Sequence, residues 1–152
     1  MTGGSAVTLH MIKLCVGADS IEDLARWQKG RLAEQRKSGE KPRLFHTTRM
    51  VPKRQDQLVD GGSLYWVIKG VLQVRQGITG FGDGRKADGT PCCLVYLDPG
   101  LVAVYPTPRR AFQGWRYLEH ADAPADIKDS QARGLAALPP KMRKELAELG
   151  LL

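Results

Sequence analysis

The sequence contains few cysteines, and they lack the spacings that disulfide frameworks and metal sites require. Cys15, Cys92 and Cys93 are the three cysteines among 152 residues, and no Cys-x-x-Cys pair is present. An odd count with one adjacent pair does not fit a secreted disulfide framework. Neighbouring strand residues point to opposite faces, so Cys92 and Cys93 form a poor chelating pair. We therefore expect reduced, mostly buried thiols, a cytoplasmic location, and neither a metal nor another cofactor.

Long apolar runs and secretion signals are missing as well. The apolar stretch at residues 7–16 contains His10 and Lys13 and is too short to span a bilayer. It also lacks the charged start and the small-residue cleavage site of a signal peptide. We expect no membrane partner, a flexible leader at residues 1–6 and a first strand after it.

Three motifs that identify common enzyme classes are absent. The chain has no G-x-x-x-x-G-K-[ST] phosphate loop, no G-x-S-x-G nucleophile elbow and no H-E-x-x-H metal motif. The glycine-rich run at residues 80–84 is not followed by a helical pattern, which an anion site at a helix N-terminus would need. We interpret residues 79–91 as an exposed hairpin loop. Whether the protein is an enzyme stays open at this point.

What the chain does contain predicts a single domain. Its 152 residues, 42% of them apolar, suffice for one compact core without a disulfide or a metal. Apolar residues alternate through residues 63–78, which indicates one long strand with one buried face, and Gly70 in its middle indicates a bulge or a bend. The expected elements are a strand at 7–16, a helix at 20–36, a strand at 43–51, a short helix at 53–59, strands at 63–78, 92–97, 101–105 and 109–118, and a C-terminal helix.

This order of elements defines the expected fold class. Strands joined by short turns favour antiparallel pairing, and no repeated βαβ pattern is present. We therefore expect an α+β fold, with a curled, mainly antiparallel sheet or a small open barrel and with peripheral helices. Residues 1–152 form one domain in this interpretation, with a helical C-terminal extension at residues 119–152.

Positive charge is concentrated in one part of the sequence. The whole chain has a net charge of +7, whereas residues 26–54 hold ten basic and two acidic side chains, a difference of +8. A concentrated basic field attracts polyanions, above all nucleic acid. A solvated helix and loop that keep the protein soluble would show the same run of charge.

His46 and the cations that follow it form the first candidate site. A histidine acts as general acid or base where a nucleophile or carboxylate lies beside it. Arg49, Lys53 and Arg54 follow His46 closely in the sequence and are suited to hold an anion. A histidine on a half-apolar strand face more often makes a structural hydrogen bond, so both interpretations stay open.

A second candidate site combines cations with an aromatic ring. Alternation places Tyr65, Lys69 and Arg75 on the less buried face of the long strand. Single-stranded nucleic acid is bound in this way, with charge on the backbone and stacking on the bases. The alternative is a partly covered sheet face on which the stems of the basic side chains pack.

A third candidate site lies near the end of the strand region. Residues 109–118 contain Arg109, Arg110 and Arg116, and guanidinium groups bind phosphate through paired hydrogen bonds. In the alternative interpretation this is a terminal strand whose aromatic residues close the core.

Four long and unusual segments carry a resemblance to a known family. They read TRMVPKR at residues 48–54, GGSLYWVIKG at 61–70, PRRAFQGWRYL at 108–118 and DAPAD at 122–126. Over most of residues 9–127 the chain resembles a family of small bacterial proteins of unknown function. That resemblance implies no activity and no functional residues. The expected curled sheet is also similar in outline to the PUA-like barrels that bind RNA or modified bases, which is a likeness of fold alone.

Three functions remain under consideration. The leading hypothesis is a nucleic-acid-binding module, for RNA above all, that uses a basic sheet face with aromatic residues. The second is an enzyme for a phosphorylated or nucleotide-like substrate, with His46 as acid or base and Arg49, Lys53, Arg109 or Arg110 holding the anion. The third is a protein-interaction module that acts through the C-terminal helix. The sequence leaves the oligomeric state open.

Overall fold

The structure, a computed structural model, describes residues 8–127. The predicted leader at residues 1–6 and the predicted C-terminal helix lie outside the described residues. The described elements are β1 (Leu9–Leu14), α1 (Ile21–Lys37), β2 (Phe45–Thr48), α2 (Gln55–Val59), β3 (Ser63–Ile68), β4 (Val71–Arg85), β5 (Pro91–Leu97), β6 (Val102–Pro108), β7 (Trp115–Glu119) and the 3₁₀ helix η1 (His120–Asp122).

The helix α1 begins where the sequence supplies a cap. Ser20 has an extended backbone, and its hydroxyl accepts a hydrogen bond from the amide of Asp23 at 3.1 Å. This bond satisfies one of the free donors of the first turn. Acidic residues occupy the first turn, and Arg36 and Lys37 occupy the last, which suits the helix dipole. The predicted helix at residues 20–36 is confirmed to within one residue at each end.

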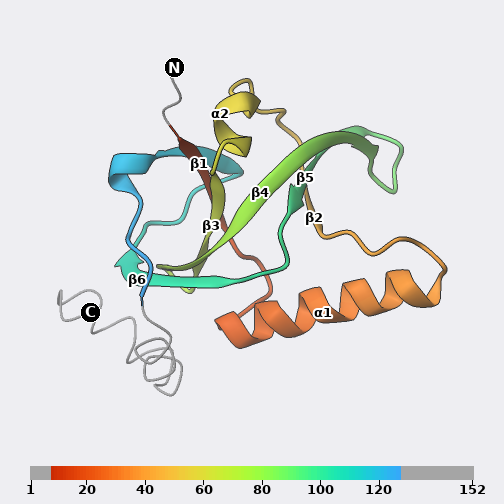
Figure 1. The fold of residues 1–152 in the computed structure, drawn as a ribbon, viewed down its shortest axis with the longest axis horizontal. Coiled ribbons are helices and arrows are strands. Elements are labelled where there is room, and N and C mark those ends of the chain that lie inside the picture. The colour runs from red at the N-terminus through yellow and green to blue at the C-terminus, as the bar shows by residue number, and fades with distance from the viewer. Residues whose placement is uncertain (1–7, 128–152) are drawn as a thin grey trace.

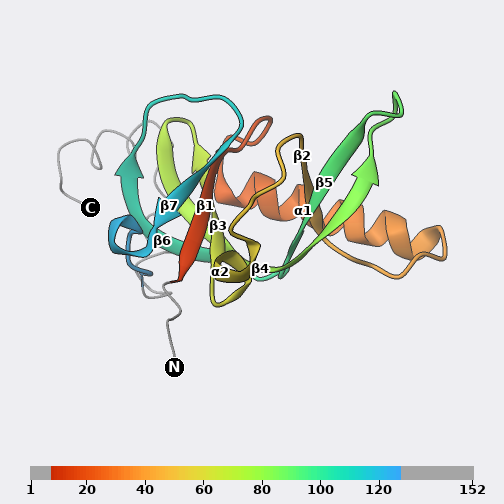
Figure 2. The same ribbon diagram turned by 90° about the horizontal axis from the view of Figure 1, so that it is seen from above.

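Seven strands form one mostly antiparallel sheet (Figures 1 and 2). Their order is β2–β5–β4–β3–β1–β7, and β6 pairs with β4. The first half of β4 lies between β3 and β6, and its second half pairs with β5. The strands β1 and β3 run parallel. The α+β fold is confirmed, and of the two expected forms the sheet is the open one, because it does not close into a barrel.

The prediction of one long strand at residues 63–78 is wrong, because this segment is a hairpin. β3 ends at Ile68 and β4 begins at Val71. Lys69 and Gly70 join them with φ angles of 52° and 78°, the positive values that a two-residue hairpin turn requires. Such a turn exchanges the faces of odd and even positions, and a one-residue register shift further along β4 exchanges them back. The even positions of β4 beyond the shift therefore face the same side of the sheet as the even positions of β3, as they would in one strand.

Most of the glycine-rich segment at residues 79–91 is strand, so the predicted loop is wrong as well. β4 continues to Arg85, and the turn is confined to residues 86–90. Every second residue at this end of β4 is a glycine. A Cβ atom at Gly82 would lie 2.9 Å from the ring of Tyr96 on β5. Glycine is needed here because a cross-strand aromatic ring lies over the backbone.

The predicted last strand at residues 109–118 is shorter than expected. β6 extends to Pro108, residues 109–114 form a loop, and β7 begins at Trp115. We expected the prolines after residue 105 to end the strand. They are tolerated because, within the described residues, the other side of β6 pairs only around Val104, with residues 125–127. A missing amide donor at Pro106 or Pro108 therefore breaks no second ladder.

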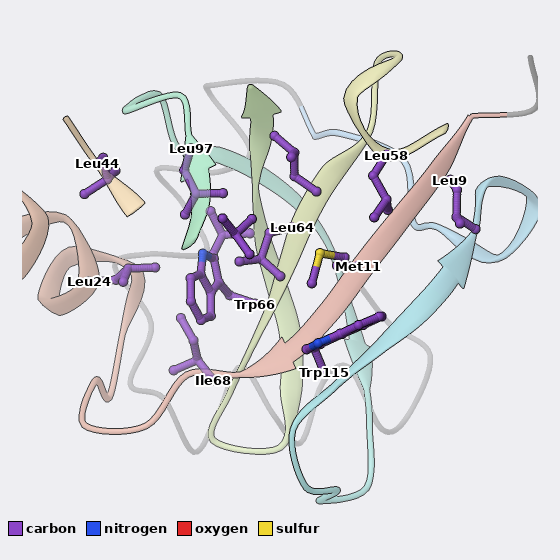
Figure 3. Close-up of a cluster of buried hydrophobic side chains, with 13 residues drawn as sticks. Leu9, Met11, Leu24, Leu44, Leu58, Leu64, Trp66, Ile68, Leu97 and Trp115 are labelled. Atoms are coloured by element: carbon purple, nitrogen blue, oxygen red, sulfur yellow. The ribbon is translucent and has the colours of Figure 1, made fainter. Parts of the chain in front are cut away.

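Two apolar clusters cover the two faces of the central strands. The first lies between the sheet and the helices and includes Leu24 of α1, Leu58 of α2 and Trp66 of β3 (Figure 3). The second lies on the other face and includes Ile12 and Tyr65. Every residue of β3 is buried as a result.

A buried amide network connects α1 to the sheet. The side chain of Gln76 is 0% exposed, and its Oε1 accepts hydrogen bonds from Gln28 at 2.8 Å and from the indole of Trp66 at 2.9 Å. Its Nε2 donates to Gln28 at 3.0 Å and to the carbonyl of Asp98 at 3.1 Å. The carboxamide thereby uses all of its hydrogen-bonding positions.

Gly62 is the glycine at which the described fold leaves the least room for a side chain. A Cβ atom there would overlap the carbonyl oxygens of Leu58 and Leu9. Both are backbone atoms, which move only if α2 or β1 moves. We expect Gly62→Ala to lower the free energy of unfolding by about 2–4 kcal/mol, measured by urea denaturation.

Gly30→Ala is the matched control for this prediction. A Cβ atom at Gly30 meets nothing within 4 Å, and alanine favours the interior of a helix by about 1 kcal/mol over glycine. This variant should be neutral or more stable than the wild type. Equal unfolding midpoints for the two variants would contradict the proposed steric constraint at Gly62.

Candidate functional site

The arginines near the end of the strand region converge in space. Arg109, Arg110 and Arg116 line one hollow together with Phe112, and its volume is about 670 Å³. None of the nine residues that line it is acidic. We call this site the arginine hollow. It gathers positive charge on the surface without an opposing carboxylate in its lining.

Local structure explains how these side chains meet. The amide of Arg109 donates to the carbonyl of Gly70 at 2.9 Å, which holds the start of the loop at the β3–β4 turn. Gly114 has a φ of 69°, and the chain turns there into β7. The guanidinium of Arg116 lies 5.0 Å from the centre of the Phe112 ring. This is a cation–π contact, and it keeps Arg116 at the loop.

Arg109 carries an unsatisfied donor. Its Nε–H group is buried, and no residue between 8 and 127 accepts a hydrogen bond from it. Leaving such a donor without an acceptor costs about 1–3 kcal/mol. This unmet donor belongs to a side chain that lines the arginine hollow.

The cations from the first half of the chain lie elsewhere. The hydroxyl of Tyr117 accepts hydrogen bonds from the amides of Lys53 at 3.0 Å and Arg54 at 3.2 Å. Successive side chains of a strand point to opposite faces, so this group and the neighbouring Arg116 lie on different faces of β7. Arg49 is exposed in the segment after β2. The structure does not bring these three cations into the arginine hollow.

The prediction that Tyr65, Lys69 and Arg75 share a less buried sheet face is wrong. Tyr65 is 4% exposed, because the second apolar cluster covers its face of β3. Lys69 lies in the hairpin turn, and its Nζ is 3.0 Å from a carboxylate oxygen of Asp19. Arg75 donates two hydrogen bonds of 2.7 Å to Asp126. Tyr65 and Arg75 are cross-strand partners on one face, but Tyr65 is buried, Arg75 is bound by Asp126 and Lys69 lies in the turn. The three side chains therefore form no open cationic surface.

His46 lies in the wall of a smaller pocket, between the start of α1 and the strands β1, β2 and β3, which we call the Trp27–His46 pocket. Burial lowers the pKa of His46 from 6.5 to about 4, and the charges of Lys13 and Arg31 act in the same direction. The hydroxyl of Thr48, at the end of β2, donates to the backbone carbonyl of Met50 and not to His46. The acid–base role of His46 stays a prediction.

Sequence reasoning missed a pair of histidines. Nε2 of His10 and Nδ1 of His120 are 2.9 Å apart. Nδ1 of His10 accepts a hydrogen bond from the amide of Ser63 at 3.0 Å. The proton of a neutral His10 ring is therefore on Nε2, which donates to His120. The two rings meet because β1 pairs with β7, and no local sequence signal shows that pairing.

The histidine pair adjoins the ion pair of Arg75 and Asp126. Arg75 also donates to the hydroxyl of Ser63 at 3.0 Å, and its hydrogen bonds lower the pKa of Asp126. Burial lowers the pKa of His10 from 6.5 to about 4, with His120 and Arg75 adding to the effect. The Ser63 hydroxyl binds a guanidinium and not an imidazole, so it lacks the base that would activate a nucleophile.

Other kinds of site receive no support from the described residues. Within residues 8–127, no three His, Cys, Asp or Glu side chains gather closely enough to hold a metal ion. No helix in that range is long and apolar enough to cross a membrane. Cys92 and Cys93 are buried free thiols, and burial raises the pKa of the half-buried Cys15 to about 11, which disfavours its reactive thiolate.

The fold and its surface define the class of this protein: an α+β protein with an open, mostly antiparallel sheet and an arginine-lined hollow at one end of it. The chain belongs to the DUF1489 family, described as proteins of unknown function, whose sequence profile matches residues 11–152. The predicted membership of an uncharacterised family is thereby confirmed. No curated protein and no solved structure matches the chain significantly.

The lowered pKa of His10 makes stability depend on pH. Its pKa is 6.5 in the unfolded chain and about 4 in the fold, so the unfolded state binds more protons between these values. The stabilisation is complete above the unfolded value and is lost as the pH falls towards the folded one. We expect His10→Asn to reduce the slope of the free energy of unfolding against pH in this range by up to about 1.4 kcal/mol per pH unit. The Asn oxygen still accepts the hydrogen bond from the Ser63 amide, but the side chain does not titrate.

The measurement is the free energy of unfolding in urea at a series of pH values. His46 has a lowered pKa of the same size, so the variant should retain part of the slope. Above the unfolded pKa of histidine the two proteins serve as each other's control, because their difference in stability should be constant there. An unchanged slope in His10→Asn would contradict the buried, neutral state assigned to His10.

Proposed function

We propose that the protein binds single-stranded nucleic acid, with RNA as the expected class, through the arginine hollow. The observation that carries this proposal is the convergence of Arg109, Arg110 and Arg116 around a space of about 670 Å³ with no carboxylate in its lining. Guanidinium groups match phosphate oxygens through paired, charge-assisted hydrogen bonds. Three such groups without an opposing charge suit a chain of phosphates.

Phe112 and Arg116 supply the planar surfaces that this kind of binding uses. Proteins that bind single strands combine charge on the backbone with stacking on the bases. RNA bases stack on guanidinium planes as well as on aromatic rings, and here the Arg116 guanidinium lies over the Phe112 ring. The proposal therefore depends on this loop and no longer on the sheet face that contains Tyr65.

The overall charge supports the same proposal. The chain has a net charge of +7, with ten basic and two acidic side chains in residues 26–54. The guanidinium of Arg54 lies 5.5 Å from the centre of the Tyr117 ring, on the face of β7 opposite Arg116, and is paired with Glu119 at 3.8 Å. Glu119 offsets the charge of Arg54, so the support comes from the positive excess of the chain as a whole, which attracts a polyanion and speeds its association.

The combination of Arg110→Ala and Arg116→Ala tests the proposal. Both residues are exposed, so folding should be unaffected, which circular dichroism would verify. We expect binding to labelled single-stranded RNA of mixed sequence, measured by fluorescence anisotropy, to weaken about tenfold or more. Each lost phosphate contact should also reduce the slope of log K against log salt by about 0.7.

Arg85→Ala combined with Lys86→Ala is the matched control, because it removes the same charge elsewhere. These residues lie at the tip of the β4–β5 hairpin, at the end of the molecule away from β6 in both views (Figures 1 and 2). This pair should leave the affinity close to that of the wild type. Equal losses in the two double variants, or no salt-dependent binding by the wild type, would contradict the proposal. Parallel titrations with single-stranded DNA test the preference for RNA.

A further inference from the structure

The Trp27–His46 pocket has the size of a small-molecule site and is separate from the arginine hollow. Its volume is about 220 Å³, the space of roughly seven water molecules at about 30 Å³ each. The end of β1, residues 16–18, the first turns of α1, His46 of β2 and Trp66 of β3 enclose it. A ring with one substituent fits a space of this size.

Apolar side chains at the rim of the pocket are unusually exposed. Val16 is 90% exposed and Trp27 is 55% exposed, and both belong to the pocket lining. Large apolar residues that gather at a concave site, instead of lying singly on the surface, mark a place where a ligand or partner covers them. Trp66 forms part of the interior, where Figure 3 shows it beside Leu24 of α1. The pocket therefore offers aromatic surface both at its rim and inside.

The planar groups in the pocket favour a flat ligand. The indole of Trp66 donates its proton to Gln76, and the part of its buried ring that lines the pocket is left for contact with a ligand. The guanidinium of Arg31, which is outside the lining of the pocket, packs over one face of the Trp27 ring at 4.6 Å from its centre, so the other face is the one left for a ligand. Aromatic rings prefer offset-stacked or edge-to-face partners at short distances. An aromatic ring bound between these residues would make such contacts with Trp27 or Trp66.

The charge in the pocket favours an anion. Lys13 is half-buried in the lining, and no carboxylate of residues 8–127 lies within ion-pair distance of its ammonium group. The lining contains one acidic residue, Asp23, and that carboxylate is already bound by Arg26 and by the amide of Asp19. The unpaired charge of the pocket is therefore positive.

His46 supplies a polar group that lacks a partner. Its Nε2 is buried and makes no hydrogen bond with any of the described residues. The ring stands edge-on to Trp66, with centroids 5.1 Å apart and an interplanar angle of 89°. A neutral imidazole either donates or accepts at this nitrogen, depending on its tautomer. This nitrogen without a partner belongs to a ring in the lining of the pocket.

From these observations we propose that the Trp27–His46 pocket binds a small aromatic anion, a planar ring that carries one carboxylate or phosphate group. The ring lies against Trp27 and Trp66, and the anionic group pairs with Lys13. An aromatic carboxylic acid and an aryl phosphate share this chemistry. The site does not depend on the nucleic-acid binding proposed above.

Isothermal titration calorimetry of the full chain tests the proposal with charged and neutral probes. Benzoate and phenyl phosphate are the anionic probes, and benzamide and phenol are their neutral counterparts. We expect at least one anion to bind about tenfold or more tightly than its counterpart, the range expected for one charge-assisted contact. Binding of benzoate alone identifies an aromatic carboxylic acid, and binding of phenyl phosphate alone identifies an aryl phosphate. Equal binding within both pairs, or no saturable binding of either anion, overturns the proposal.

Variants locate the binding within the molecule. Lys13→Met keeps most of the stem and removes the charge, so the preference for the anion should disappear. Trp27→Ala should weaken the charged and neutral probes alike. Lys29→Met, at an exposed position of α1 outside this pocket, is the matched control and should change nothing. Arg110→Ala with Arg116→Ala should also retain the binding of the anion. If Lys29→Met and the double arginine variant lost the preference for the anion and Lys13→Met kept it, the anion would bind outside the pocket.

Discussion

A carboxamide that is wholly buried needs a partner at each of its hydrogen-bonding positions, because an unmade bond costs about 1–3 kcal/mol. Gln76 of β4 obtains these partners from Gln28 of α1, from the indole of Trp66 in β3 and from the carbonyl of Asp98 after β5. Elements far apart in the sequence are held at one point as a result. The network fixes where α1 crosses the sheet and how the Trp66 ring is turned. The Trp27–His46 pocket depends on both, because α1 carries one side of it and Trp66 forms another.

The parts of the fold that follow from local chemistry could be predicted from the sequence. Ser20 and Asp23 mark the start of α1, and the strand periodicity identified the α+β class. The errors came from signals that periodicity does not carry. The turn at Lys69 and Gly70 and the register shift in β4 cancel in their effect on odd and even positions. Gly82 lacks a side chain because the ring of Tyr96 lies over it. Both features depend on the partner strand.

The candidate site shows the same limit for charge. Arg75 and Lys69 carry full charges in the sequence, yet each is paired with a carboxylate far along the chain, at Asp126 and Asp19. Pairing of this kind reduces the field that a polyanion meets, and alternation within one strand gives no sign of it. Arg109, Arg110 and Arg116 could be named from the sequence because they lie within one short segment. Their common hollow exists because β6 ends at Pro108 and the following loop turns back into β7.

The strand β1 links the two proposed sites physically. Ile12 lines the arginine hollow, and its neighbour Lys13 lines the Trp27–His46 pocket. Successive side chains of a strand point to opposite faces, so the two sites lie back to back across one strand. Ile12 is opposite Arg116 of β7, and Lys13 is opposite Trp66 of β3. A ligand in one site therefore leaves the other open. Any coupling between them would have to pass through a displacement of β1, which its parallel partner β3 and its antiparallel partner β7 both oppose.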